Sequence, residues 1–222
     1  MISPLLSNVY LNEVDKMLER AKEVTRHPRW TGLEYCRFAD DLVVLVSAHP
    51  EQYWLRGAVD KRLREEFAKL GVEVNEAKSR TVDLDKGENF GFLGFEFRRT
   101  RSRSGRRIPL CTPQRKKRTA LLRTLKAVFR GHLSQPVGRV IAIINPIVRG
   151  WVNYFAYGHL SRCFCYIQAW VERKIRRHLA RACQRGGFGW KRWSRQWLYD
   201  ALGLFADYRV RYGRPLMKAA PV

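Results

Sequence analysis

The sequence predicts an α+β fold, in which a small mixed unit is followed by a basic, all-α helical bundle. In the first 97 residues, two β-prone runs flank a pair of aspartates, and a helical repeat and an alternating segment follow. Beyond residue 112, apolar residues recur at helical spacing. The charge changes in the same region: residues 1–97 hold 14 basic and 17 acidic residues, whereas residues 98–222 hold 29 and 3. Two chemically different halves are therefore expected.

Composition narrows the class of protein. The 222 residues include 45% hydrophobic residues and seven Trp, enough for a packed core, and the formal net charge of +23 predicts a polyanionic partner. No apolar run reaches the ~18 to 20 residues that a bilayer span needs, and no signal-peptide pattern is present, so we expect a cytoplasmic protein without a membrane partner. Five cysteines without a C-x-x-C pair argue against a disulfide framework and a structural zinc site.

The first half is predicted to be an α+β unit of the ferredoxin-like or palm type. Its expected elements are a helix over 4–22, a hairpin over 34–46, a helix over 51–70 that buries Trp54 and ends at Gly71, a strand over 72–74 and a strand or hairpin over 89–97. The hairpin carries Asp40 and Asp41 at its tip. Paired carboxylates are hard oxygen ligands suited to Mg²⁺, although adjacent aspartates also occur in turns for backbone hydrogen bonding.

The second half is predicted to be helical and basic. Residues 98–107, RRTRSRSGRR, are expected to be a flexible loop that touches phosphate, within a linker over 98–112. The predicted helices cover 115–130, from 136 to before Pro146, 147–155 and 161–184. An aromatic and basic tail over 190–222 contains Trp190, Trp193, Trp197, Tyr199, Phe205 and Tyr208, for which core packing is favoured over base stacking. The domain division expected from these patterns is 1–97, 98–112, 113–189 and 190–222.

Five stretches, in this order, resemble the reverse transcriptase/maturase proteins of group II introns. Residues 2–12, ISPLLSNVYLN, are similar to the palm segment that contacts the incoming nucleotide and template, and 35–41, YCRFADD, to the metal-binding motif, with Phe38 where Tyr is more usual. Residues 71–78, GVEVNEAK, are similar to the next palm motif, and FLGF at 92–95 to the primer-grip turn. Residues 144–155, INPIVRGWVNYF, are similar to the maturase-specific segment, called domain X or the thumb.

The resemblance implies a partial polymerase palm followed by a thumb, and a set of site residues. The implied catalytic residues are Asp40, Asp41 and Lys78, with Mg²⁺ at Asp40 and Asp41 and Lys78 protonating the leaving pyrophosphate. The implied nucleotide and template contacts are Ser3, Pro4, Ser7 and Asn8, and the implied primer grip is Phe92, Leu93 and Gly94. Structured, intron-like RNA or an RNA/DNA hybrid is expected at the cations Arg115, Lys116, Lys117, Arg118, Arg149, Arg173, Lys174, Arg176, Arg177 and Arg181.

The sequence also departs from the family pattern. A complete polymerase of this family has fingers and an earlier palm aspartate, and neither is present, while Glu13 and Asp15 are not expected to reach the site. Weak metal binding and no polymerase activity are therefore expected of the chain alone. Four interpretations stay open: a reverse transcriptase part completed by a second polypeptide, a non-catalytic RNA-binding splicing factor, a truncated inactive product and a DNA-binding structural protein. Basic charge alone does not distinguish RNA binding from DNA binding.

Overall fold

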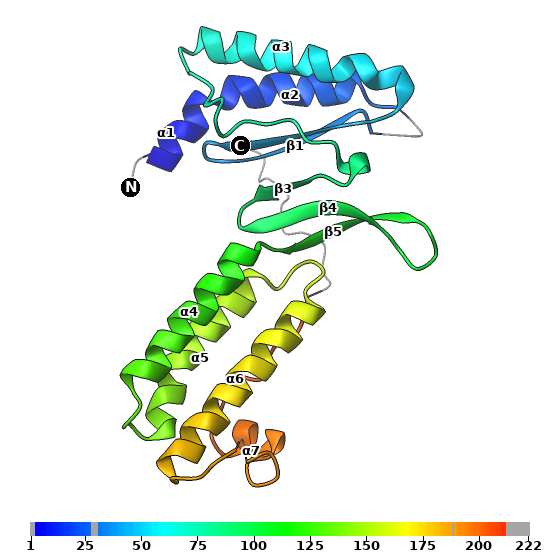
Figure 1. The fold of residues 1–222 in the computed structure, drawn as a ribbon. Helices are drawn as coiled ribbons and strands as arrows, with labels where there is room; N and C mark the ends of the chain where they lie inside the picture. Colours follow the sequence, from blue (N-terminus) through cyan, green and yellow to red (C-terminus); the bar gives the residue numbers. More distant parts are fainter. Residues whose placement is uncertain (1–2, 28–30, 188, 212–222) are drawn as a thin grey trace. The chain divides into compact units, whose positions relative to one another are not determined.

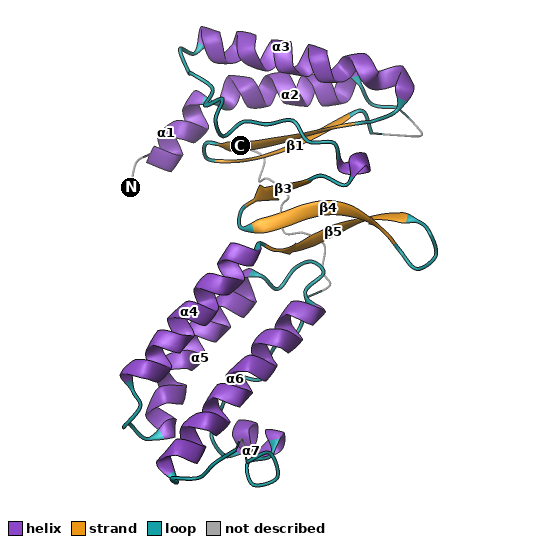
Figure 2. Ribbon diagram, in the orientation of Figure 1, coloured by secondary structure: helices purple, strands orange, loops and turns teal. Residues whose placement is uncertain are grey.

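The computed structural model of the chain describes residues 3–27, 31–187 and 189–211, with side chains from residue 7 onward. The chain forms two compact units, residues 1–81 and 82–222 (Figures 1 and 2). This division falls earlier than the boundary expected at residue 97.

Helices cover one side of the hairpin in the first unit. Helix α1 spans Ser3–Tyr10, α2 spans Asn12–Val24 and α3 spans Tyr53–Lys69, preceded by the 3-10 turn η1 at Pro50–Gln52. The predicted single helix over 4–22 is thus interrupted at Leu11. Helices α2 and α3 lie side by side, and α2 also contacts β1 (Figure 1).

The predicted hairpin is confirmed. Strands β1 (Leu33–Phe38) and β2 (Asp41–Val46) pair antiparallel, with Tyr35 opposite Val44 and Phe38 opposite Asp41. Because side chains alternate along a strand, Leu33 and Tyr35 share one face. That face packs into the core of the unit, which is made of Val14, Leu18, Leu33, Leu55 and Val59 with partly buried neighbours around them.

Two expectations for this unit are wrong. Residues 72–74 form no strand: they pair with neither edge of the β1–β2 sheet, which is the sheet of the described part of this unit. Trp54 is 64% exposed on α3 instead of buried. The end of α3 is as expected: Gly71 has φ 64°, the left-handed conformation that favours glycine after a helix.

The second unit begins with a three-stranded antiparallel sheet in the order β3-β4-β5. Its strands are β3 (Asn89–Phe92), β4 (Phe95–Arg101) and β5 (Arg107–Pro113). The predicted hairpin over 89–97 is confirmed as β3 and β4. The flexible loop expected over 98–107 is shorter in the structure: Arg98–Arg101 continue β4, residues 102–106 form the turn and Arg107 begins β5, because Ile108, Leu110 and Thr112 give the basic run a paired, β-prone partner.

Three long helices follow the sheet: α4 (Arg115–Gly131), α5 (Val137–Tyr154) and α6 (Ser161–Ala182). Their apolar stripes form one core. The expected break at Pro146 is wrong, since α5 runs through it. Proline removes the bond to the Ala142 carbonyl, but both residues are exposed, while Ile144 and Val148 continue the buried stripe. None of the described helices is long and apolar enough to cross a membrane.

A buried carboxylate joins the C-terminal segment to α6. Glu172 accepts hydrogen bonds from Arg195 Nε at 2.8 Å and from the Tyr199 hydroxyl at 2.7 Å, and Arg176 Nη1 lies 3.3 Å away. Arg176 also donates to the Trp193 carbonyl at 2.9 Å. Burial and the Glu172 carboxylate raise the pKa of Tyr199 above its usual range.

Four aromatic residues of the expected tail pack on the bundle. Trp193 and Leu198 are buried in the bundle core, Leu198 within the short helix α7 (Arg195–Asp200), and Tyr199, Phe205 and Tyr208 pack against that core. Core packing, the favoured role, is confirmed for these aromatic residues. Trp190 and Trp197 stay partly exposed, and residues 212–222 of the predicted tail lie outside the described part of the chain.

Replacing Arg176 with leucine should lower the free energy of unfolding by about 3–5 kcal/mol, because it leaves part of the buried Glu172 charge uncompensated. Urea unfolding followed by tryptophan fluorescence measures this. The matched control is Arg173→Leu, an exposed cation on the same helix, which should change stability by less than about 0.5 kcal/mol. Equal effects of the two substitutions would contradict the role assigned to the buried pair.

Candidate metal site and nucleic-acid interface

The β1–β2 hairpin presents both predicted catalytic carboxylates at its tip. A two-residue turn, Ala39 and Asp40, joins Phe38 to Asp41. Ala39 has φ 51°, a left-handed conformation that is uncommon outside glycine. Asp40 and Asp41 are both exposed, so each carboxylate is open to solvent and to a ligand.

Two of the four residues implied to contact nucleotide and template lie against this tip. The Ser7 hydroxyl donates to Asp40 Oδ1 at 2.5 Å, and Asn8 Oδ1 accepts a hydrogen bond from Arg37 Nη1 at 3.0 Å. Ser3 and Pro4 belong to the backbone of α1, and their side chains lie outside what the structure describes. Helix α1 is thereby fixed to the hairpin tip through its last turn.

Arg37 braces the turn, and the sequence reasoning missed it. Its Nη1 donates to the Ala39 carbonyl at 3.0 Å, while Nε donates to Asp15 Oδ1 at 2.9 Å and Nη2 binds Asp15 Oδ2. The hydrogen bonds that Arg37 donates to the Asp15 carboxylate raise the pKa of Arg37, whose side chain is 10% exposed. The sequence does contain a pattern that indicates this role. Arg37 shares its strand face with Leu33 and Tyr35, and a cation on a face that packs into the core requires a partner on the packed helix.

The described residues do not complete a metal site by themselves. No group of three His, Cys, Asp or Glu side chains that could hold an ion occurs in the part of the chain that is described. Asp15 lies closer to the hairpin than expected, but both of its oxygens are bound by Arg37. Asp40 and Asp41 are oxygen donors of the type Mg²⁺ prefers, and the remaining positions of an octahedral ion would need other ligands.

Lys78, the implied acid, is exposed in a turn after α3. Its backbone N–H donates to the Asn75 carbonyl at 3.0 Å and to Asn75 Oδ1 at 3.2 Å. Among the described contacts, none joins Lys78 to Asp40 or Asp41, so its role stays a prediction.

The implied primer-grip turn is held by the helices of its own unit. Leu93 and Gly94 have φ 49° and 81°, and they connect β3 to β4. The Tyr154 hydroxyl at the end of α5 donates to the Leu93 carbonyl at 2.9 Å, and the Gln114 N–H donates to the Gly94 carbonyl at 2.9 Å. The turn that includes Phe92, Leu93 and Gly94 is thus fixed to the ends of α4 and α5.

Most of the cations implied to bind RNA are accessible on the second unit. The exposed ones are Arg115, Lys116, Lys117, Arg149, Arg173, Arg177 and Arg181, and the partly buried ones are Arg118 and Lys174. Arg176 is the exception at 1% exposure, with its guanidinium directed to Glu172 and Trp193. The expectation that Arg176 binds RNA is therefore wrong, because helical spacing placed this charge on the buried side of α6.

A cluster of cations faces across α4 and α6. Partial burial, followed by repulsion from Arg177, Lys126 and Arg130, lowers the pKa of Lys174. Lys126 and Arg130 are one helical turn apart on α4, and neither was predicted as a site residue. We call Lys126, Arg130, Lys174 and Arg177 the α4–α6 basic face. Their mutual repulsion favours an anionic ligand there.

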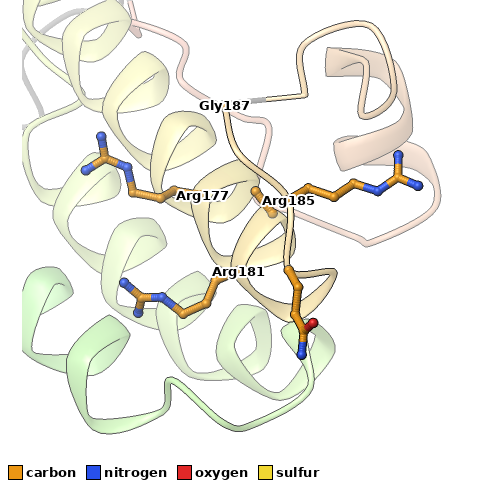
Figure 3. A pocket seen from close by; sticks show the side chains of 6 residues that line it. Arg177, Arg181, Arg185 and Gly187 are labelled. Carbon is orange, nitrogen blue, oxygen red and sulfur yellow. The ribbon is translucent and has the colours of Figure 1, made fainter.

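The end of α6 borders a shallow hollow of ≈ 470 Å³, lined by Arg177, Ala180, Arg181, Gln184, Arg185 and Gly187. Arg177 and Arg181 extend to one side, toward the neighbouring helices, and Arg185 extends to the other (Figure 3). These guanidinium groups do not converge on one point. The arrangement suits an extended anion better than a single enclosed ion.

Two family models match successive parts of the chain. Residues 1–97 match the family model for reverse transcriptase (RNA-dependent DNA polymerase), and residues 118–199 match the model for the group II intron, maturase-specific domain. Protein YkfC of Escherichia coli strain K12 is 31% identical to this chain over an alignment that covers 53% of this chain and 36% of that protein. The chain thus spans about a third of the length of this relative.

The two matches occur in the same order as the two chemically different halves, the carboxylate hairpin first and the basic helices second. Together they establish that this chain belongs to the group II intron reverse transcriptase/maturase family.

Proposed function

We propose that the chain binds structured, intron-like RNA through the helices of its second unit. The observation that carries this proposal is the lack of internal counter-charge. Helices α4, α5 and α6 contain a single acidic residue, Glu172, and that carboxylate is buried against Arg176 and Arg195. Within the described residues, no ion pair with an acid is found for Lys126 and Arg130, which are exposed on α4, and RNA phosphates would provide negative charge there.

The α4–α6 basic face is the strongest candidate for this contact. Its cations come from two packed helices, so their spacing is set by the bundle core and not by a mobile loop. Contacts of this kind go to the phosphate backbone and position the RNA without reading its sequence. Specificity for a structured RNA would then come from the shape of the folded strand.

Replacing Lys126, Arg130 and Lys174 together with glutamine should reduce the salt dependence of RNA binding by about 2 to 3 log units of affinity per log unit of salt, at 0.7 to 0.9 for each phosphate neutralised. Equilibrium binding to a structured RNA across a salt series measures this. The matched control removes three exposed cations of α3, Arg56→Gln, Lys61→Gln and Arg62→Gln, and should leave the slope unchanged.

A control variant that loses as much slope as the α4–α6 variant would show that total charge, and not this face, determines binding. A duplex DNA of the same sequence serves as competitor. Displacement of the RNA at equal concentration would favour the interpretation as a general DNA-binding protein.

A second function, RNA-directed DNA synthesis, is favoured by the braced hairpin tip. We propose that Asp40 and Asp41 provide two of the ligands for Mg²⁺ and that a further carboxylate, from outside the described residues, completes the site. The support is the Arg37 brace together with the exposed pair, an arrangement suited to holding two carboxylates in fixed positions. This function requires both acids, whereas RNA binding requires neither.

Primer extension on an RNA template with Mg²⁺ tests this function. We expect extension when a second polypeptide that carries a palm aspartate is added to these 222 residues, and none without it. Asp40→Asn should then abolish extension and leave RNA affinity unchanged. The control Asp60→Asn removes an exposed carboxylate of α3 and should have no effect. Extension that survives Asp40→Asn would exclude the proposed site.

Arg37→Lys should lower the free energy of unfolding by about 1.5–3 kcal/mol. Lysine keeps the charge but cannot bind Asp15 with two nitrogens and the Ala39 carbonyl with a third, so at least one charged hydrogen bond is lost. Thermal or urea unfolding measures the change. Arg56→Lys, at an exposed position of α3, is the matched control. Unchanged stability of Arg37→Lys would show that the brace does not fix the turn.

A further inference from the structure

The β4–β5 hairpin concentrates positive charge on an ordered ribbon. Residues 98–107 contain six arginines and no acidic residue. The strands pair in continuous register up to Arg101 and Arg107, which lie directly opposite each other. Like charges at directly opposed positions destabilise a β-pair, and of these two arginines Arg107 has an acidic partner, Asp85.

A single carboxylate relieves only the base of the charged segment. Asp85 Oδ1 accepts hydrogen bonds from Arg99 Nη1 at 2.5 Å and from Arg107 Nη1 at 2.7 Å. Within the described residues, no acidic partner is found for the side chains of Arg101, Arg103 and Arg106 at the tip, and all three are exposed. The charge of the tip is therefore directed to solvent.

Backbone hydrogen bonds give the tip a defined shape. The Ser102 N–H donates to the Arg106 carbonyl at 2.7 Å, and the Gly105 N–H donates to the Ser102 carbonyl at 3.0 Å. Gly105 adopts φ 79°, which closes the turn at little conformational cost. The arginines are thus presented from a formed hairpin, so less ordering entropy opposes binding than in a flexible loop.

The composition of the tip selects the class of partner. Residues 98–107 contain no aromatic side chain, so the platform on which unpaired bases stack is missing. They also contain no apolar side chain that would insert into a lipid surface or into a protein pocket. Arginine and serine donors without apolar or aromatic groups are suited to phosphate and 2′-hydroxyl groups.

We propose that the tip of the β4–β5 hairpin is a second RNA contact, in which Arg101, Arg103 and Arg106 bind the phosphates that border the minor groove of an A-form RNA stem. This proposal rests on the RNA binding proposed above and adds a contact separate from the α4–α6 basic face. The minor groove of A-form RNA is wide and shallow and is open to a two-stranded ribbon, whereas its major groove is too narrow and deep for side chains to read. The contact recognises duplex shape and not base sequence.

The test compares the full chain with the variant Arg101→Gln, Arg103→Gln, Arg106→Gln on two probes, an RNA stem-loop with a 20-base-pair stem and an unstructured single-stranded RNA of equal length. We expect the variant to reduce the salt slope for the stem by about 2 to 3 and to change the slope for the single strand by less than about 1. The control with three cations removed from α3 should match the parent chain on both probes.

Each outcome has a distinct meaning. Failure of the parent chain to bind either RNA overturns the proposed function itself, and this proposal with it. Binding by the parent chain with equal slopes for the hairpin variant and the α3 control overturns the hairpin contact alone. An equal loss on both probes overturns the assignment to a duplex.

A lysine version, Arg101→Lys, Arg103→Lys, Arg106→Lys, separates charge from folding. It keeps three cations at the tip, so its salt slope on the stem should stay within about 1 of the parent value. A loss as large as that of the glutamine variant would show that the arginines act through the structure of the hairpin, and would overturn the proposal. Circular dichroism of all variants checks that the helices remain formed.

Discussion

The second unit depends on the burial of one carboxylate, Glu172. Its oxygens are shared by Arg176, Arg195 and Tyr199, and this network holds the segment after α6 against the bundle. Removing two charged groups from water is favourable only when their hydrogen bonds are satisfied, as they are here. Because the bundle uses the acid of its long helices internally, its outer surface is left with cations. The burial of Glu172 therefore both stabilises the bundle and removes the acid of the long helices from the outer surface.

Charge is distributed differently in the first unit. Several of its cations form ion pairs with nearby acids, as in Lys22 with Glu34 and Arg64 with Asp60 and Glu76. Arg37 is matched by Asp15 in the same way, but it also reaches the backbone of the hairpin turn. The Arg37–Asp15 ion pair thus helps to position Asp40 and Asp41, which remain exposed at the tip. A unit with near-zero net charge can keep a localised negative site, which a uniformly basic surface would neutralise.

The elements that the sequence predicted well are those with a periodic pattern and a clear stop. The hairpin over 34–46 and the helix over 115–130 were found this way. Where prediction failed, the decisive partner was distant in sequence. Residues 72–74 have strand composition but do not join the β1–β2 sheet, whereas residues 98–101 extend β4 by pairing with β5. Pro146 is tolerated because its helix stays buried on the opposite side. In the candidate site, Asp40 and Asp41 followed from a motif, whereas Arg37 and the burial of Arg176 depended on packing between elements.

The backbone of Ala39 adds a constraint on how this protein can vary. A residue at φ 51° tolerates glycine, asparagine or aspartate, but a β-branched side chain clashes there with its own backbone. A change such as alanine to valine alters no charge and removes no ligand, yet it would force the turn into another shape and move both acids. A substitution at this uncharged, partly buried position can therefore displace the carboxylates of Asp40 and Asp41 although both residues are retained.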